Sequence, residues 1–479
     1  MLFPTVAFAV FFVAAFAANW LLRPHFLVWR ATMIAVSLYF YGWIDVRFVF
    51  VLVGSAAVNA ALAVAVRRAM PGSEPTGASR GLVRAAVAAN LAVLGLFRYH
   101  GFFVDSVADA LGTIGLHPSS PTLDLLVPIG LGFLTLHAIS YVVDVGRGDI
   151  EPVAFADVLL YMSFFPHVVA GPIVRVDELV PQFHERPDPR RVAATEAFAL
   201  IGLGLVKVVA VAGFLGREVV DPAFAAPGTR SGTELAVAAW AFAVEIYADL
   251  SGYTDVALGC ALLLGIRLPA NFAAPYRSLS VREFWRRWHM TLARWLRDYV
   301  YIPLGGSRAG PATTRRNLVV TMLLAGLWHG PAWTFVAWGG LHGAYLVGER
   351  AATAWYAARP ALPAAAAPVS AVLRWLLTFN LVTLAWVFFR ADSVGSALEI
   401  VGRIAIGAAG SSALVTGLVV AVVAGALILQ VVPRHGSDPL RAWFSTRGPL
   451  TQAAVLAAGL TVVGVLAPDG VAPFLHYRF

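Results

Sequence analysis

The sequence predicts an all-α, polytopic integral membrane protein, and three observations support this fold class. Of its 479 residues, 59% are hydrophobic and 13% are charged, whereas soluble domains have roughly 25% charged residues. The mean hydropathy is +0.75. Apolar stretches recur along the chain, many of them near the ~20 residues that a spanning helix needs, and arginine-rich loops separate several of them.

The apolar stretches predict about 11 full spans, with partial and interfacial helices in addition. They lie near 4–22, 26–44, 47–66, 82–97, 125–145, 155–174, 193–214, 235–266, 317–349, 371–390, 395–408, 411–432 and 451–467. The stretches around Pro128–Gly132 and Pro166–His167 combine proline, glycine or histidine with apolar residues. Such interruptions are typical of re-entrant or broken helices that line a cavity.

The polar segments predict the orientation of the chain in the membrane. The loops at 67–84, 181–191 and 277–316 are rich in arginine, so the positive-inside rule places them in the cytoplasm. The N-terminus has no basic region before its first apolar run, which predicts a retained span and not a cleaved signal peptide. Lys207 is the single lysine, and this bias toward arginine is typical of GC-rich bacterial genes.

Composition also excludes several functional classes. The net charge of +8 is explained by cytoplasmic loops, so no nucleic-acid binding is expected. Cys260 is the only cysteine, which excludes an internal disulfide and a two-cysteine metal site. No Cys/His/Asp cluster suggests a metal centre, and no bound cofactor is predicted.

The segment from Ser280 to Tyr301 gathers charged and aromatic residues within an otherwise apolar chain. Ser280 and Glu283 have the spacing of a capping box, which predicts that a helix begins there. Apolar side chains then recur every three or four residues while arginines occupy another side, a pattern typical of an interfacial helix. The apolar positions are Phe284, Trp288, Leu292, Trp295 and Tyr299.

Two interpretations of this segment remain open. It can serve only as an interfacial anchor, or its arginines can bind the phosphates of a nucleotide-containing donor through fork-shaped hydrogen bonds. The predicted donor-binding residues are Arg286, Arg287 and Trp285.

Two histidines are the candidate catalytic residues, because polar groups within apolar sequence are costly and usually functional. His329 follows a long apolar run and precedes Gly330-Pro331, which interrupts the backbone and can hold the imidazole at a cavity. An imidazole can remove a proton from a hydroxyl nucleophile. His289 lies on the apolar side of the predicted interfacial helix. Each can instead be a packed structural histidine.

The residues at 271–308 and 317–343 closely resemble those of the membrane-bound O-acyltransferases, and more narrowly the bacterial branch of alginate O-acetylation and teichoic-acid D-alanylation membrane proteins. The first range reads NFAAPYRSLSVREFWRRWHMTLARWLRDYVYIPLGGSR and the second NLVVTMLLAGLWHGPAWTFVAWGGLHG. Similar ordered matches lie upstream at 39–43, 128–144, 164–173 and 249–255. The resemblance implies one membrane-bound O-acyltransferase domain over 1–479, with a core segment at 275–345 and C-terminal helices at 391–479.

The resemblance implies helices around a central tunnel, His329 as the catalytic residue and His289 as the second histidine of the site. It implies a multi-pass protein of the bacterial cytoplasmic membrane that takes an acyl group, foremost acetyl, from a cytoplasmic thioester. The expected donor is acetyl-CoA or an acylated carrier protein. The expected acceptor is a hydroxyl of an extracytoplasmic polysaccharide or of an esterase-like partner transferase.

Other functions also fit the sequence. D-alanyl or other acyl transfer to teichoic acid or a small product fits the same family. A polysaccharide or lipid transporter, or an export scaffold, fits the same composition. Relatives often end in a motif whose tyrosine is a candidate acyl relay, whereas this chain ends FLHYRF, so a relay through Tyr477 competes with a simple interfacial anchor.

Overall fold

The computed structural model describes residues 1, 3–72, 74–116, 126–169, 171–358 and 366–431, with short pieces between 443 and 458. Within these ranges the regular structure is helical, no β-strand occurs, and one isolated bridge joins Arg230 to Ser411. The predicted all-α class is therefore confirmed. The chain forms two compact units, Met1–Ala197 with Ala257–Pro269, and Phe198–Val256 with Ala270–Phe479.

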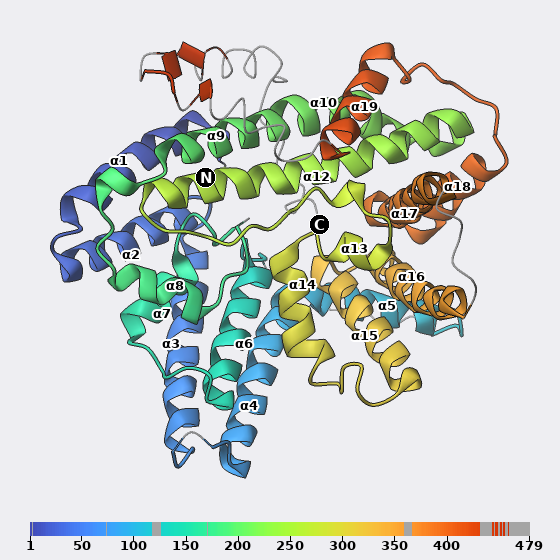
Figure 1. Ribbon diagram of the computed structural model, residues 1–479. Helices are drawn as coiled ribbons and strands as arrows, with labels where there is room; N and C mark the ends of the chain where they lie inside the picture. The colour runs from blue at the N-terminus through green and yellow to red at the C-terminus, as the bar shows by residue number, and fades with distance from the viewer. Residues whose placement is uncertain are drawn as a thin grey trace. The chain divides into compact units, whose positions relative to one another are not determined.

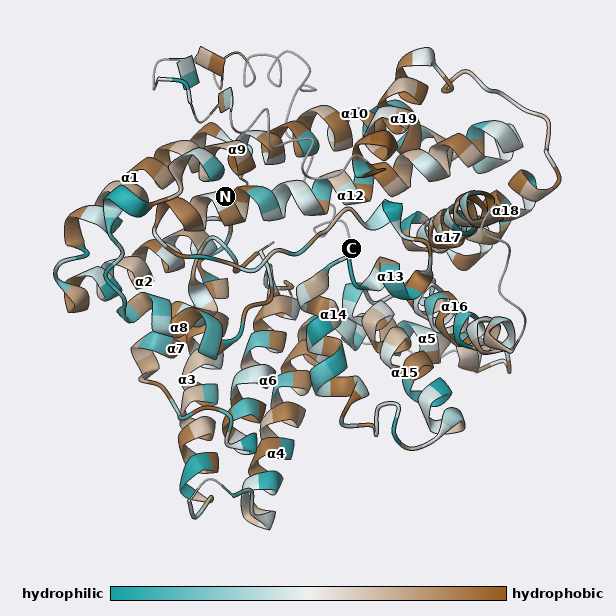
Figure 2. Cartoon of the chain, in the orientation of Figure 1, coloured by the Kyte–Doolittle hydropathy of each residue, from teal (hydrophilic) through white to brown (hydrophobic). Residues whose placement is uncertain are grey.

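Several helices have the length and composition of membrane spans. Among the described residues these are Arg47–Arg68, Gly77–Gly112, Ala194–Ala225, Gly232–Leu263 and Ala367–Arg390. Three shorter helices are also apolar, namely Val6–Leu22, Phe26–Gly42 and Gly417–Val431. Hydrophobic residues predominate along these helices, whereas the last turn of α3, which ends with Arg67 and Arg68, is hydrophilic (Figure 2). The multi-pass membrane class is confirmed, and the number of spans stays a prediction.

The first unit contains the N-terminal helices. They are α1 (Val6–Leu22), α2 (Phe26–Gly42), α3 (Arg47–Arg68), α4 (Gly77–Leu94), η1 (Gly95–Tyr99), α5 (His100–Gly112), α6 (Leu131–Arg147), α7 (Phe155–Ser163), α8 (Val176–His184) and η2 (Pro189–Arg191). Helices α3, α4 and α6 pack side by side (Figure 1). Asn59 of α3 and Asn90 of α4 exchange two side-chain hydrogen bonds of 3.1 and 2.8 Å, which satisfies both amides inside the apolar interface.

The predicted interruptions in this unit are confirmed as helix ends. Helix α6 begins directly after Gly130, whose φ of +72° favours glycine, and a Cβ there would lie 2.8 Å from the carbonyl oxygen of Val168. Helix α7 ends at Ser163, just before Pro166 and His167. The turn at Gly130 therefore sets the start of α6, and α7 has only nine residues.

The second unit contains the remaining helices. They are α9 (Ala194–Leu205), η3 (Val206–Ala212), α10 (Gly213–Leu215), η4 (Gly216–Val220), α11 (Asp221–Ala225), η5 (Pro227–Thr229), α12 (Gly232–Leu263), η6 (Pro275–Arg277), α13 (Val281–Trp285), α14 (Met290–Leu296), η7 (Arg297–Tyr301), α15 (Pro311–His329), α16 (Trp333–Ala357), α17 (Ala367–Arg390), α18 (Val394–Ala405) and α19 (Gly417–Val431). The first residues of α9 and the last turns of α12 belong to the first unit.

Small residues bring the helices of the second unit close together. Gly204 and Gly252 face each other, so that a Cβ on Gly252 would lie 2.7 Å from the Gly204 carbonyl oxygen. Beside this crossing Lys207 Nζ lies 2.6 Å from Asp255 Oδ2, which compensates both charges. Helices α15 and α16 form an antiparallel hairpin in which Gly339 packs directly on the Met322 backbone (Figure 1).

Two predictions about helices need correction. The single helix predicted over 280–301 is interrupted between α13 and α14, because the backbone turns at 286–289. The apolar stretch at 395–408 forms α18, whose 12 residues extend about 18 Å and fall short of the ~30 Å hydrocarbon core.

Candidate active site

His329 is the last residue of α15, where the sequence predicts a helix end. Gly330 continues in an extended conformation with φ of −173°, and α16 begins at Trp333. The His329 side chain is buried, with 5% relative exposure. A Cβ on Gly330 would clash with the ring of Phe335, so glycine at this position allows the two helices to turn tightly beside the histidine.

His289 lies at the break between α13 and α14. Its backbone is left-handed, with φ of +40° and ψ of +54°, a region that non-glycine residues seldom adopt. The residue is buried, with 3% relative exposure. Burial lowers the pKa of His289 to about 4, so the imidazole is neutral at physiological pH.

The indole of Trp328 brings the two histidines into one cluster. Its ring centroid lies 6.1 Å from that of His289, nearly perpendicular to it, and 4.9 Å from that of His329. His329 also contacts Trp338 of α16 at 5.2 Å and Phe389 of α17 at 5.1 Å. Both predicted catalytic residues are therefore buried in the same aromatic surroundings, which exclude water from the site.

His342 extends this cluster. It is fully buried in α16, and its Nδ1 accepts a hydrogen bond of 3.2 Å from Trp285 Nε1. Its ring centroid lies 4.8 Å from that of Trp338, which in turn contacts His329. The indole N–H of Trp285, a predicted donor-binding residue, is thus already used inside the protein.

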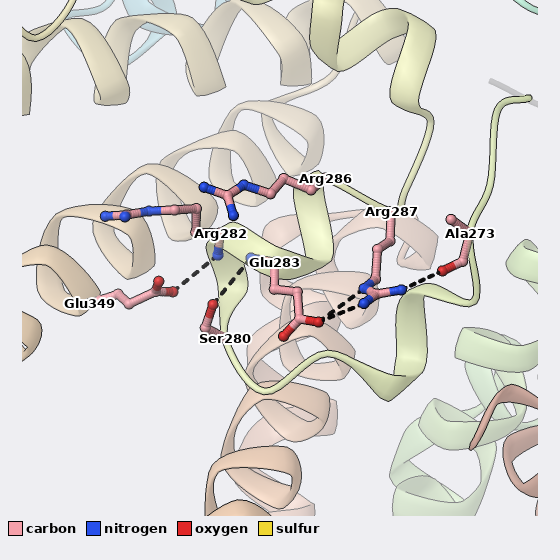
Figure 3. Close-up of a pocket in the computed structure, with 7 residues that line it drawn as sticks. All are labelled: Ala273, Ser280, Arg282, Glu283, Arg286, Arg287 and Glu349. Carbon is pink, nitrogen blue, oxygen red and sulfur yellow. Dashed lines mark hydrogen bonds and ion pairs between the residues drawn. The ribbon is translucent and has the colours of Figure 1, made fainter. Parts of the chain in front are cut away.

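A polar cavity of about 530 Å³ opens beside α13 (Figure 3). Its lining consists of three arginines, two glutamates, a serine and an alanine, namely Ala273, Ser280, Arg282, Glu283, Arg286, Arg287 and Glu349. The Ser280 hydroxyl accepts from the Glu283 N–H at 3.1 Å, as the capping box predicts, while Glu283 Oε2 accepts from Leu279 N–H and not from Ser280. One wall of the cavity is therefore the capped first turn of α13.

The two predicted donor-binding arginines have different surroundings. Arg287 donates to Glu283 Oε1 at 2.9 and 3.0 Å and to the carbonyl oxygen of Ala273 at 3.1 Å, so it has a structural role. Burial alone would raise the pKa of Glu283. Hydrogen bonds from the Leu279 N–H and from Arg287 outweigh burial and hold that pKa below its usual value. Arg286 is exposed and extends along the cavity near Arg282 (Figure 3). Neither Arg282 nor Arg286 forms an ion pair through its guanidinium group within the described part of the chain, whereas Arg287 pairs with Glu283.

Sequence reasoning missed several residues of the site. Trp386 and Phe389 of α17 pack at 5.6 and 5.5 Å from Trp338, but in sequence they look like any packed face of a spanning helix. Asn271 holds the first turn of α14 and is separated from it by 18 or more residues. The ion pair of Glu283 with Arg287 had a visible signal, since their spacing of four residues favours pairing on one helical face.

Tyr477 and its tail lie outside the described residues. The central tunnel stays a prediction. Among the described residues no group of three or more His, Cys, Asp or Glu side chains could hold a metal ion.

Comparison with known proteins points to one family. The model of MBOAT, the membrane-bound O-acyltransferase family, matches residues 93–388, a range that includes both histidines. The chain is 37% identical over 396 residues to the Pseudomonas aeruginosa protein named "Probable alginate O-acetylase", covering 82% of this chain and 73% of that protein. It is 34% identical to the Helicobacter pylori peptidoglycan O-acetyltransferase, covering 81% and 75%. It is 28% identical to the Streptococcus thermophilus teichoic acid D-alanyltransferase, covering 47% and 57%.

Proposed function

The chain belongs to the membrane-bound O-acyltransferase family and is an O-acyltransferase, and from this premise we propose that it transfers an acetyl group across the bacterial cytoplasmic membrane. The donor is a cytoplasmic thioester, and the acceptor is a hydroxyl of an extracytoplasmic polysaccharide or of a partner transferase. The two O-acetylating relatives match over most of this chain, whereas the D-alanylating relative matches over less than half, which supports acetyl as the group transferred.

The observation that carries this proposal is the cluster of His289 and His329 around Trp328. In the reaction the acceptor oxygen attacks the thioester carbonyl carbon while His329 takes the hydroxyl proton. The C–S bond then breaks, and the proton passes from His329 to the departing thiolate. His289 is neutral and has one N–H, which can stabilise the negative charge that develops on the carbonyl oxygen.

The arginine-lined cavity supports a cytoplasmic binding site for the donor. Arg282 and Arg286 present guanidinium groups that pair well with phosphate, and His289 follows Arg286 by three residues. Acetyl-CoA and an acylated phosphopantetheine carrier both contain phosphate near the thioester arm. Either donor can therefore bind its phosphate here while the acyl end extends toward the histidines.

Membrane vesicles that contain the protein can test the proposal with radiolabelled acetyl-CoA, acetylated carrier protein and D-alanylated carrier protein. His329→Ala and His329→Gln are expected to reduce acyl transfer at least 100-fold, since neither side chain can accept the proton. His25→Ala is the matched control, because His25 is exposed and caps α2 without a side-chain hydrogen bond. Full transfer by both His329 variants would refute the catalytic assignment. Transfer of D-alanine with no transfer of acetyl would refute the acyl group proposed.

A further inference from the structure

Two strained residues mark the backbone around His289. Among the described non-glycine residues, positive φ angles occur at Ala274, with +50°, and at His289, with +40°. Ala274 ends the segment 271–274, and His289 lies in the middle of the segment 287–291, which is joined to the first by backbone hydrogen bonds. Strain of this kind persists only where surrounding contacts fix the conformation, and it occurs preferentially at functional sites.

The contacts that fix this conformation come from Asn271. Its backbone carbonyl oxygen accepts from the Met290 N–H at 2.9 Å. Its side-chain Oδ1 accepts from the Thr291 N–H at 3.2 Å and from the Thr291 hydroxyl at 2.9 Å. Both asparagine and threonine are 3% exposed. Met290 and Thr291 form the first turn of α14, whose N–H groups have no partner within the helix.

A residue at an N-cap usually satisfies these N–H groups with its own side chain. His289 occupies the N-cap position of α14 but makes no such bond. The hydrogen bonds to Asn271 replace the missing side-chain cap. The His289 imidazole can therefore turn toward Phe272 and Trp328, whose ring centroids lie 6.0 and 6.1 Å from its own. A second backbone hydrogen bond fixes the same two segments against each other: the Ala273 N–H donates to the Arg287 carbonyl oxygen at 2.9 Å.

We propose that Asn271 is a positioning residue for acyl transfer: it caps α14 from a separate segment, holds His289 in its left-handed conformation and thereby directs the imidazole toward Trp328 and His329. This inference rests on the proposed function, since it assigns Asn271 a role only through His289. Asn271 itself touches neither donor nor acceptor.

Size-matched variants separate positioning from packing. Asn271→Leu keeps the volume but removes the acceptor, and it is expected to reduce kcat on the order of 100-fold with an unchanged donor KM, as expected for a displaced catalytic group. Asn271→Asp retains the acceptor, and aspartate caps helices as well as asparagine, so it is expected to restore most of the rate. Thr291→Val removes only the hydroxyl donor and is expected to cause a smaller loss.

A double-mutant cycle gives the decisive result. If Asn271 acts through His289, then Asn271→Leu lowers the rate in the wild-type protein but causes no further loss in a His289→Ala background. Thr291→Val provides the same comparison if the leucine variant does not accumulate in the membrane. Equal factors of loss in both backgrounds would overturn the inference. This outcome is distinct from failure of the proposed function, which would show as full activity of the His329 variants.

Discussion

The α15–α16 hairpin allows a sharp test, because two adjacent glycines of α16 have opposite surroundings. A Cβ on Gly339 would clash with the Met322 carbonyl oxygen and would lie 3.0 Å from the Met322 carbonyl carbon and 3.1 Å from Leu323 Cα. All three are backbone atoms, so no side-chain rotation can relieve the contact. A Cβ on Gly340 would meet only Leu323 Cδ2, at an ordinary 3.8 Å.

Gly339→Ala must therefore move α15 away from α16 by about 1 Å, since ordinary contacts begin near 3.4 Å. Met322 precedes His329 by seven residues and lies on the same face of α15, so the displacement reaches the histidine. A shift of about 1 Å at a catalytic group costs on the order of 100-fold in rate. The free energy of unfolding distinguishes the two variants less well than the rate does. In Gly339→Ala the overpacking costs about 1–3 kcal/mol, but replacing a helical glycine with alanine offsets about 1 kcal/mol of that cost.

The assay compares acetyl transfer per molecule of protein in vesicles for Gly339→Ala and Gly340→Ala, with the melting temperature of each purified in detergent. Gly340→Ala is expected to transfer at the wild-type rate and to melt slightly higher. Equal rates for the two variants would refute the reasoning that the spacing between α15 and α16 positions His329.

Two further predictions concern the cavity beside α13. Arg286→Glu is expected to raise the donor KM about tenfold with kcat unchanged, because a tenfold change corresponds to roughly 1.4 kcal/mol of lost phosphate binding. Arg308→Glu is the control, since Arg308 is exposed and lies outside the cavity. Equal KM values for the two variants would contradict the assignment of Arg286 to donor binding. The lowered pKa of Glu283 means that its stabilising contribution is complete above the unfolded value of 4.5 and is lost as the pH falls through the lower folded value. The melting temperature of the wild-type protein should therefore exceed that of Glu283→Gln at neutral pH and approach it in acid, and a constant difference would argue against the Glu283–Arg287 ion pair.

Local signals in the sequence predicted the parts of the site that depend on neighbouring residues. Ser280 begins α13, and Gly330-Pro331 ends α15 at His329, because capping and the loss of helical hydrogen bonds act over a few positions. The break at His289 was missed because apolar residues keep their spacing of three or four through the turn. That break depends on Asn271, and a contact over 18 or more residues leaves no periodic signal. The choice between Arg286 and Arg287 likewise required the fold, since only packing shows which guanidinium is already bound.

The two histidines occupy opposite kinds of helix terminus, and this arrangement suits the different roles that we propose for them. His329 ends the 19-residue α15, where the free carbonyl groups carry partial negative charge and favour the cation that forms when the imidazole accepts a proton. His289 stands before the first N–H groups of α14, and burial lowers its pKa, so it is too weak a base to compete for that proton and can act as a hydrogen-bond donor. Helix ends normally require water or capping groups, which a buried site cannot take from solvent. Asn271 supplies them for α14, so the same contact that satisfies the helix also fixes the backbone that places the His289 ring beside Trp328.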